Sequence, residues 1–153
     1  MIDQNVPIIS YEILGVKVNP MTVEELHVII DDCIHDQQKT IIANVNVHAL
    51  NLAYKLPWLR DFLNKAPVVF CDGAGVKLGA KILGYDIPGR ITYADWMWQL
   101  GALVSDKGYS LYFLGAREGV AERAAEVLSE RFPKINVLGT HHGFFDKSPG
   151  SEE

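Results

Sequence analysis

The run Val68-Val69-Phe70-Cys71-Asp72-Gly73-Ala74-Gly75 decides the fold class of this chain. Four consecutive apolar residues with no polar alternation are typical of a parallel strand that is buried on both faces. The carboxylate of Asp72 and two glycines end the run abruptly, and apolar residues at helical spacing begin near Val76. A strand that turns directly into a helix is the building unit of an α/β fold.

The same strand-to-helix order recurs on both sides of this run. The strands expected from apolar and β-branched runs cover residues 8–19 (a strand or short hairpin), 40–46, 67–71, 110–114 and 135–139. The expected helices cover about residues 23–36, 48–55, 58–64, 76–83, 93–105 and 120–132. Helix caps are predicted at Thr22 with Glu25 and at Thr92 with Asp95. The pattern predicts a mostly parallel sheet with helices on both faces.

The composition fits one folded domain. Hydrophobic residues make up 48% and charged residues 22% of the 153 residues, which predicts a packed core rather than disorder. We expect a single α/β core over residues 1–146, followed by a polar, flexible tail over residues 147–153. The net charge of −5, with no basic stripe, argues against a nucleic-acid partner.

The cysteines and the hydropathy pattern favour a cytoplasmic protein. Cys33 and Cys71 lie far apart in apolar surroundings, so reduced buried thiols are expected. The N-terminus has neither the basic segment nor the apolar segment of a signal peptide. No apolar stretch approaches the ~20 residues that a membrane-spanning helix needs.

Polar residues follow three of the expected strands. Asn44, Asn46 and His48 come at the end of the strand over 40–46, and Asp72 follows the strand over 67–71. The turn over 115–119 follows the strand over 110–114. Because ligands of open parallel sheets bind beyond the carboxyl ends of the strands, these residues are the candidate site.

Asp72 has two interpretations that the spacing does not separate. At the mouth of the sheet, partial burial would raise the pKa of its carboxyl group toward neutrality and suit it to act as a general base. Alternatively, Asp72 is the N-cap of the helix near Val76 and accepts backbone hydrogen bonds.

The other candidates also have alternative interpretations. The turn with Gly115 and Arg117 resembles a phosphate-binding turn. It is neither a Walker sequence nor the glycine pattern of NAD sites, and the alternative is that it serves only as a turn. Arg90 follows Pro-Gly and would pair with a phosphate or simply face solvent. His48 is a candidate acid or base, or a helix-start residue with local bonds. A metal site at His141 would need further ligands that the sequence does not offer, so no metal is expected.

Five stretches together carry a resemblance. They are Asn44–Ala53 (NVNVHALNLA), Asp72–Val76 (DGAGV), Arg90–Asp95 (RITYAD), Leu111–Ala116 (LYFLGA) and Gly139–Phe145 (GTHHGFF). In this order they resemble the WecG/TagA/CpsF glycosyltransferase family over about residues 10–146. The resemblance implies a Rossmann-like α/β fold. It also implies an enzyme that inverts the configuration at the anomeric carbon, without a DxD metal motif and without a cofactor.

The resemblance also implies a reaction and its participants. A sugar, typically N-acetylmannosamine, would pass from a UDP-sugar to a polyprenyl-diphosphate-linked saccharide in cell-surface polysaccharide or teichoic acid synthesis. Asp72 matches the family's proposed base, and Arg90 matches an arginine near the donor. The remaining candidates around the substrates are Asn44 (catalytic) and Asn46, His48, Gly73, Tyr93, Asp95, Gly115 and Arg117 (binding). A homo-oligomer with peripheral contact at the inner face of the plasma membrane is expected.

The chain departs from the family pattern in three places. Asn44 stands where many members carry Thr, and Tyr93 stands where many carry Gly, so the sugar specificity is open. The third departure is length: the family's last strands and basic C-terminal segment are not present, so we expect a core with an exposed sheet edge. The alternative function is therefore a non-catalytic nucleotide-sugar-binding or oligomerisation module. A third alternative, a Rossmann-like enzyme acting on another nucleotide, lacks the glycine fingerprint of NAD sites.

Overall fold

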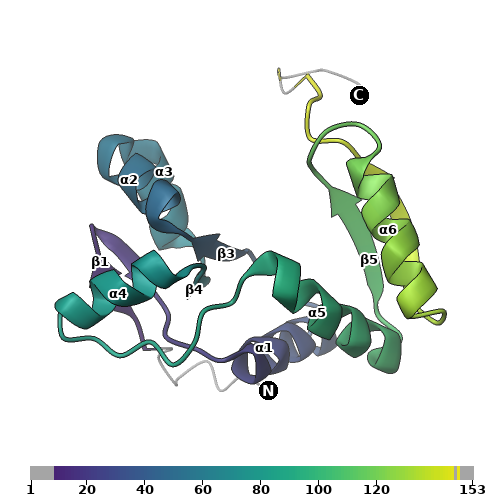
Figure 1. The fold of residues 1–153 in the computed structure, drawn as a ribbon, viewed down its shortest axis with the longest axis horizontal. Coiled ribbons are helices and arrows are strands. Elements are labelled where there is room, and N and C mark those ends of the chain that lie inside the picture. Colours follow the sequence, from purple (N-terminus) through teal and green to yellow (C-terminus); the bar gives the residue numbers. More distant parts are fainter. Residues whose placement is uncertain (1–8, 147, 149–153) are drawn as a thin grey trace. The chain divides into compact units, whose positions relative to one another are not determined.

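A computed structural model of the chain describes residues 9–146 and Ser148, which belong to two compact units, residues 1–96 and 97–153 (Figure 1). The first unit contains β1 (Tyr11–Ile13), β2 (Val16–Val18), α1 (Val23–His35), β3 (Ile42–Val45), α2 (Val47–Lys55), α3 (Pro57–Lys65), β4 (Val68–Cys71) and α4 (Ala74–Ile82). Helix α5 (Tyr93–Lys107) begins in the first unit, and β5 (Ser110–Leu114), α6 (Val120–Arg131) and β6 (Asn136–His141) follow in the second. Apart from Ser148, the polar tail expected over residues 147–153 lies outside the described residues.

The strands pair as an α/β fold requires. Strand β3 runs parallel to β4, with Ile42 opposite Val68, and β5 runs parallel to β6, with Ser110 opposite Asn136. Strands β1 and β2 form an antiparallel hairpin whose turn residues, Leu14 and Gly15, both have positive φ. Two positive φ angles match the twist of a two-residue hairpin turn. The predicted α/β class is confirmed and is consistent with a Rossmann-like fold; among the described residues the strands pair as three two-stranded sheets, β1–β2, β3–β4 and β5–β6.

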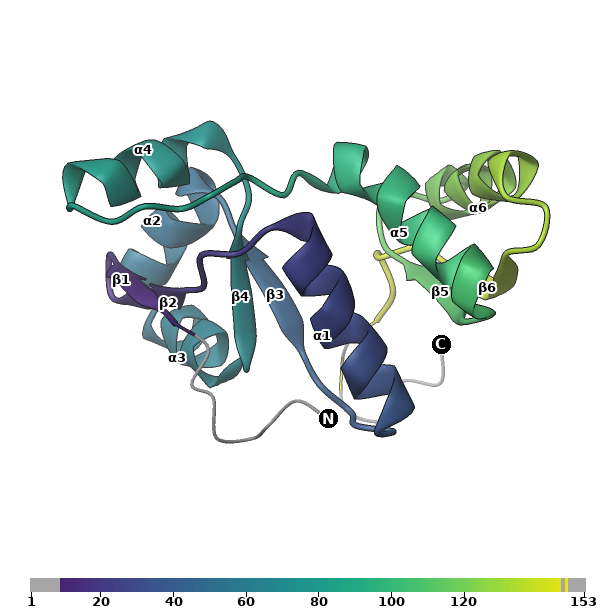
Figure 2. The same cartoon turned by 90° about the horizontal axis from the view of Figure 1, so that it is seen from below.

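Helices cover the β3–β4 pair from both sides. In Figure 2 the two strands run between α1 and the pair of helices α2 and α3. The capping box predicted for α1 is confirmed, because Thr22 Oγ1 accepts a hydrogen bond from Glu25 N–H at 3.2 Å and Glu25 Oε2 accepts one from Thr22 N–H at 2.8 Å. Strand β4 is fully buried, as its apolar run predicts, and Phe70 has no exposed surface.

Asn19 joins the hairpin to the parallel pair. Its backbone N–H donates to Val69 O at 2.7 Å, and its side-chain Oδ1 accepts from Val69 N–H at 2.7 Å. Its Nδ2 donates to Ile9 O at 3.0 Å, and the residue is only 6% exposed. The buried amide therefore continues the sheet beside β4 where β2 has ended.

Replacing Asn19 by Ala is expected to lower the free energy of unfolding by about 1–3 kcal/mol, because the buried Val69 N–H loses its acceptor. Urea unfolding followed by circular dichroism measures the loss. The matched control is Asn51→Ala on the exposed face of α2, which should stay within about 0.5 kcal/mol of the parent. Equal stability of the two variants would contradict a structural role for Asn19.

In the second unit, α6 packs on β5 and β6 through its small and apolar face, with Ala121, Ala125 and Leu128 buried. Helix α5 approaches the end of α6 at Gly101, where an added Cβ would lie 2.8 Å from the Phe132 ring. Because real Cβ atoms do not come this close, only glycine allows this approach.

Candidate active site

The parallel register of β3 and β4 brings the two predicted catalytic residues together. Asn44 lies opposite Phe70, and the N–H of Asp72 donates to Val45 O at 2.9 Å where the strands end. Asn44 Nδ2 then donates to Asp72 Oδ2 at 3.1 Å, and both side chains are half-buried. One carboxylate oxygen is thus held by an amide at the carboxyl edge of the sheet.

Asp72 is not the cap of the following helix. Helix α4 begins after Gly73, which is its N-cap, and no side chain makes a capping hydrogen bond there. The φ of Gly73 is 102°, a conformation that glycine adopts without strain. The N-cap interpretation of Asp72 is therefore wrong, and its carboxylate is not used by the helix start.

Tyr93, at the start of α5, lies close to this pair. Its ring packs edge-on against Phe70 with the ring centres 5.9 Å apart, and the side chain is partly exposed. Burial, and secondarily the negative charge of Asp72, raise the pKa of the Tyr93 hydroxyl above its ordinary value. The phenol therefore stays protonated and able to donate a hydrogen bond beside Asp72.

Asn46 and His48 lie where β3 passes into α2. Asn46 Oδ1 accepts a hydrogen bond from Ala49 N–H at 2.9 Å, so Asn46 is the N-cap of α2. His48 lies exposed in the first turn of the helix. The structural role of Asn46 was not foreseen, although Asn at the end of a strand is a common capping signal.

Arg90 and Asp95 lie on either side of a segment that is fixed to β4. The N–H of Ile91 donates to Cys71 O at 2.9 Å, which brings the loop carrying Arg90 to the residue before Asp72. The Arg90 side chain is exposed, and among residues 9–146 it has no ion-pair partner. Asp95 is exposed in the first turn of α5.

The prediction that the Thr92 side chain caps helix α5 is wrong. Thr92 O accepts backbone hydrogen bonds from Asp95 and Trp96, at 3.0 and 2.9 Å, as a helix start requires. Its Oγ1, however, is buried and has no hydrogen-bond partner within the described part of the chain. Helix α5 is held instead by aromatic packing that the capping signal does not reveal.

The contact that fixes the start of α5 joins Trp96 to His27 of α1. Trp96 Nε1 donates to His27 Nε2 at 2.9 Å, and the Trp96 ring packs edge-on against Phe70 and tilted against Tyr93. Burial lowers the pKa of His27, against a smaller opposing effect of Glu24. A neutral imidazole is the form that can accept this hydrogen bond. Sequence reasoning missed this pair because no local pattern links residues so far apart.

Acidification is expected to destabilise the first unit through His27. Since its pKa is lower in the folded chain, the unfolded chain binds the proton more readily as the pH falls below the ordinary value of 6.5. Stability is thus complete above that value and is lost as the pH falls through the folded pKa. Thermal unfolding between pH 8 and pH 5 measures the effect, and His27→Gln, which retains an acceptor that does not titrate, should flatten this part of the profile. An unchanged profile in the Gln variant would contradict this assignment.

The cysteines of this unit are buried, and burial affects the acidity of their thiols. Burial, followed by the charge of Asp72, raises the pKa of the Cys71 thiol, which lies in contact with Gly73 O at 3.6 Å. Both cysteines are free and buried, as predicted. Within the described residues, no three His, Cys, Asp or Glu side chains gather as potential metal ligands.

Gly115 and Arg117 belong to the unit of residues 97–153. Gly115 N–H donates to His141 O, and Gly143 N–H donates to Ala116 O, both at 2.9 Å. Gly115 and Ala116 have φ values of 144° and 61°, so the turn after β5 is tightly curled. Arg117 is exposed, and its own turn leads into α6. The turn is built as predicted, and its role as a phosphate site stays a prediction.

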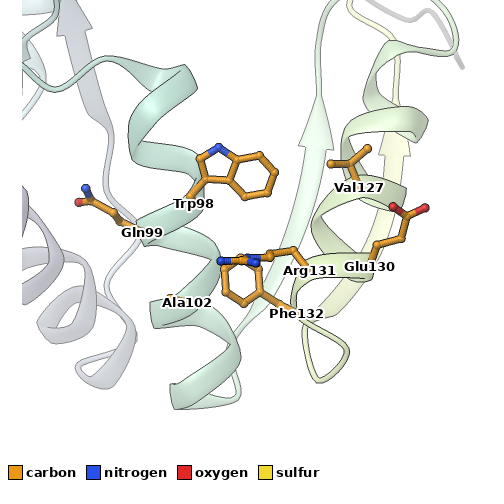
Figure 3. A pocket seen from close by; sticks show the side chains of 7 residues that line it. All are labelled: Trp98, Gln99, Ala102, Val127, Glu130, Arg131 and Phe132. Atoms are coloured by element: carbon orange, nitrogen blue, oxygen red, sulfur yellow. The ribbon is translucent and has the colours of Figure 1, made fainter.

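A hollow of about 860 Å³ lies between α5 and α6 within the second unit (Figure 3). Trp98 and Phe132 present aromatic rings to it, and Glu130 and Arg131 present charges. None of the residues predicted for the site lines this hollow. Its size alone therefore does not make it the catalytic pocket.

The chain is similar to known proteins over most of its length. Relatives from Staphylococcus aureus strains NCTC 8325 / PS 47, COL and N315 are each 27% identical to the chain over 105 residues, which is 69% of this chain and 41% of the relative. Each is named N-acetylglucosaminyldiphosphoundecaprenol N-acetyl-beta-D-mannosaminyltransferase. The matched region is thus about two fifths of the relatives' length. No helix among the described residues is long and apolar enough to cross a bilayer. The sequence model of one family matches residues 11–153, and the chain belongs to that family, the WecG/TagA/CpsF glycosyl transferases.

Proposed function

We propose that this chain carries the sugar-transfer site of an inverting glycosyltransferase. The donor is a UDP-sugar, with N-acetylmannosamine as the sugar, and the acceptor is a polyprenyl-diphosphate-linked saccharide. The observation that supports it most is the Asn44–Asp72 pair at the carboxyl ends of two parallel strands. The name of the relatives states both the transferred sugar and a diphosphoundecaprenol acceptor, and this supports the choice of substrates.

Asp72 is the base in this proposal. Its free oxygen accepts the proton of the acceptor hydroxyl as that oxygen attacks the anomeric carbon of the donor. The new carbon–oxygen bond forms on one face of the sugar while the bond to the nucleotide diphosphate breaks on the other, so the configuration inverts. The proton on Asp72 then passes to solvent. Asn44 acts by holding Oδ2 and so fixing the direction of Oδ1.

The nucleotide diphosphate leaves with negative charge, which positively charged or N–H donor groups must stabilise. Arg90, exposed on the loop fixed to β4 and free of ion pairs within the described residues, supplies a bidentate donor. The N-termini of α2 and α4, which follow Asn46 and Gly73, add free backbone N–H groups of favourable sign. In this proposal the Tyr93 hydroxyl donates to substrate oxygens.

Calorimetric titration of the chain with UDP, UDP-N-acetylmannosamine and NAD tests the donor site. Binding of the two uridine species alone is the expected result. Transfer to a polyprenyl-diphosphate-linked N-acetylglucosamine, followed by mass spectrometry of the product, tests the reaction. Uridine binding without any transfer would favour the alternative of a non-catalytic nucleotide-sugar-binding module. Absence of both would contradict the proposal.

A further inference from the structure

An apolar groove begins beside the candidate site and runs along α4. Its floor is formed by buried residues of the first unit's core, Ile13, Leu50 and Val76. Its rims carry exposed aliphatic side chains, among which Ile82 is 77% and Leu83 is 56% exposed. All nine residues that line it are apolar or glycine. Such a surface attracts aliphatic groups and offers no hydrogen bond to a sugar or a nucleotide base.

One end of the groove lies at the starts of α2 and α4. It is lined there by Val47, the first residue of α2, and by Gly75, the second residue of α4. The two helix starts are in close contact, since a Cβ on Gly75 would overlap the Val47 side chain. Gly75 is three residues from Asp72, and Val47 is next to Asn46. Moving away from Asp72, the surface thus changes from carboxylate, to helix N-termini, to aliphatic groove.

We propose that this groove binds the first isoprene units of the lipid-linked acceptor. The inference rests on the proposed function, because it takes the acceptor to be a saccharide joined through a diphosphate to a polyprenyl chain. In such a molecule the order is sugar hydroxyl, diphosphate, aliphatic chain. The same order of chemistry occurs along the surface: Asp72 for the hydroxyl, the starts of α2 and α4 for the diphosphate, and the groove for the chain.

The size and shape of the groove favour a chain over other occupants. Its volume of about 270 Å³ is below the roughly 300–1,000 Å³ of sites that enclose drug-sized ligands, so it suits a short aliphatic segment of a longer molecule. A second copy of this protein would need a surface of roughly 800 Å² with a polar rim. The groove has no such polar rim, because every residue that lines it is apolar or glycine.

Gly79 offers a direct way to fill the groove. It lies in the interior of α4 and lines the groove, and a Cβ added to it meets no atom within 4 Å. Phe also has a better helix propensity than Gly, so Gly79→Phe should fold normally. The matched control is Lys81→Phe, which adds the same ring to an exposed position of the same helix that does not line the groove. Ile82→Asp is a second variant, which places a charge on the rim.

The experiment measures binding of isopentenyl, farnesyl and geranylgeranyl diphosphate by calorimetry. For the parent chain and Lys81→Phe, affinity should rise with chain length. For Gly79→Phe and Ile82→Asp, the affinity for the two longer compounds should fall about tenfold or more, because several buried methylene contacts are lost. Binding of isopentenyl diphosphate and of UDP should not change. Equal affinity for all chain lengths, or unchanged binding in Gly79→Phe, would overturn the inference.

Two further measurements separate this inference from the proposed function. The first is sedimentation of the parent and of Gly79→Phe. If the parent is a dimer that Gly79→Phe dissociates, and the parent does not bind the prenyl diphosphates, the groove belongs to a second copy and the inference is overturned. Sugar transfer that proceeds equally well to a short-chain and a long-chain acceptor would overturn the groove and leave the proposed function standing. Chain-length-dependent binding that is lost in Gly79→Phe, in a chain without transferase activity, would support the groove while contradicting the proposed function.

Discussion

Replacing Asp72 by Asn is expected to lower the rate of sugar transfer by about 10²–10⁴-fold, because the acceptor hydroxyl loses its base. The substitution preserves the shape of the side chain, and the new carbonyl oxygen still accepts the hydrogen bond from Asn44 Nδ2. No helix cap is lost, since α4 is capped at Gly73. A radiolabelled transfer assay measures the rate, and UDP affinity measures whether the donor site survives.

Asp86→Asn is the matched control for this loss. Asp86 is exposed on the loop before Arg90 and has no role in the proposed reaction, so its neutralisation should leave the rate unchanged. A rate for Asp72→Asn within threefold of the parent would contradict the assignment of the base. A fall in UDP affinity as large as the fall in rate would instead assign Asp72 to donor binding.

The Asp72→Asn protein also carries an activity-independent readout. The charge of Asp72 is one of the two causes that raise the pKa of Tyr93. Removing it should bring that pKa closer to the ordinary tyrosine value, while burial still keeps it raised. Ultraviolet titration of the phenol, with Tyr93→Phe to identify the signal, measures the change and tests whether the two groups are neighbours in solution.

Much of the fold was predictable because its signals are local. The apolar run over 68–71 and the box at Thr22 with Glu25 each specify an element from neighbouring residues alone, and β5 has the predicted bounds. Helix starts were less predictable. Helix α4 begins at Ala74, two residues before the expected start at Val76, because its N-cap is Gly73 with a positive φ and no capping side chain marks this position in the sequence. The cap expected at Thr92 was wrong because packing of Trp96 and Phe70 fixes α5 from outside the helix.

The candidate site was predictable to the extent that it follows from strand ends. Asn44 and Asp72 meet because parallel strands in register end together, a rule that needs no knowledge of side-chain contacts. Whether Asp72 was a base or a cap could not be decided, since both roles suit a carboxylate between a strand and a helix. The bond between His27 and Trp96 had no signal at all, because it joins residues 69 positions apart on two helices.

Replacing Asn44 by Asp should shift the pH dependence of transfer as well as its rate. The variant places a second carboxylate about 3.1 Å from Asp72 Oδ2, where the parent has an amide donor. Two carboxylates at this distance repel each other when both are ionised, so the pair releases its second proton less readily and its upper apparent pKa rises. Below that raised pKa a larger share of the base is protonated than in the parent. We expect the rate to be lower than that of the parent in this range and to recover as the pH rises.

Asn44→Thr separates this electrostatic effect from the loss of the amide. A threonine hydroxyl can donate to Asp72 without adding charge. The transfer rate of Asn44→Thr should therefore depend on pH in the same way as the rate of the parent. Stability gives the second readout: in Asn44→Asp the pair binds its proton more tightly when folded, so stability is complete below the unfolded carboxyl pKa of about 3.9 and falls as the pH rises. Identical pH–rate profiles for the Asp and Thr variants would mean that Asn44 does not face the carboxylate during the reaction. A shift confined to the Asp variant would show that residue 44 faces Asp72 during the reaction.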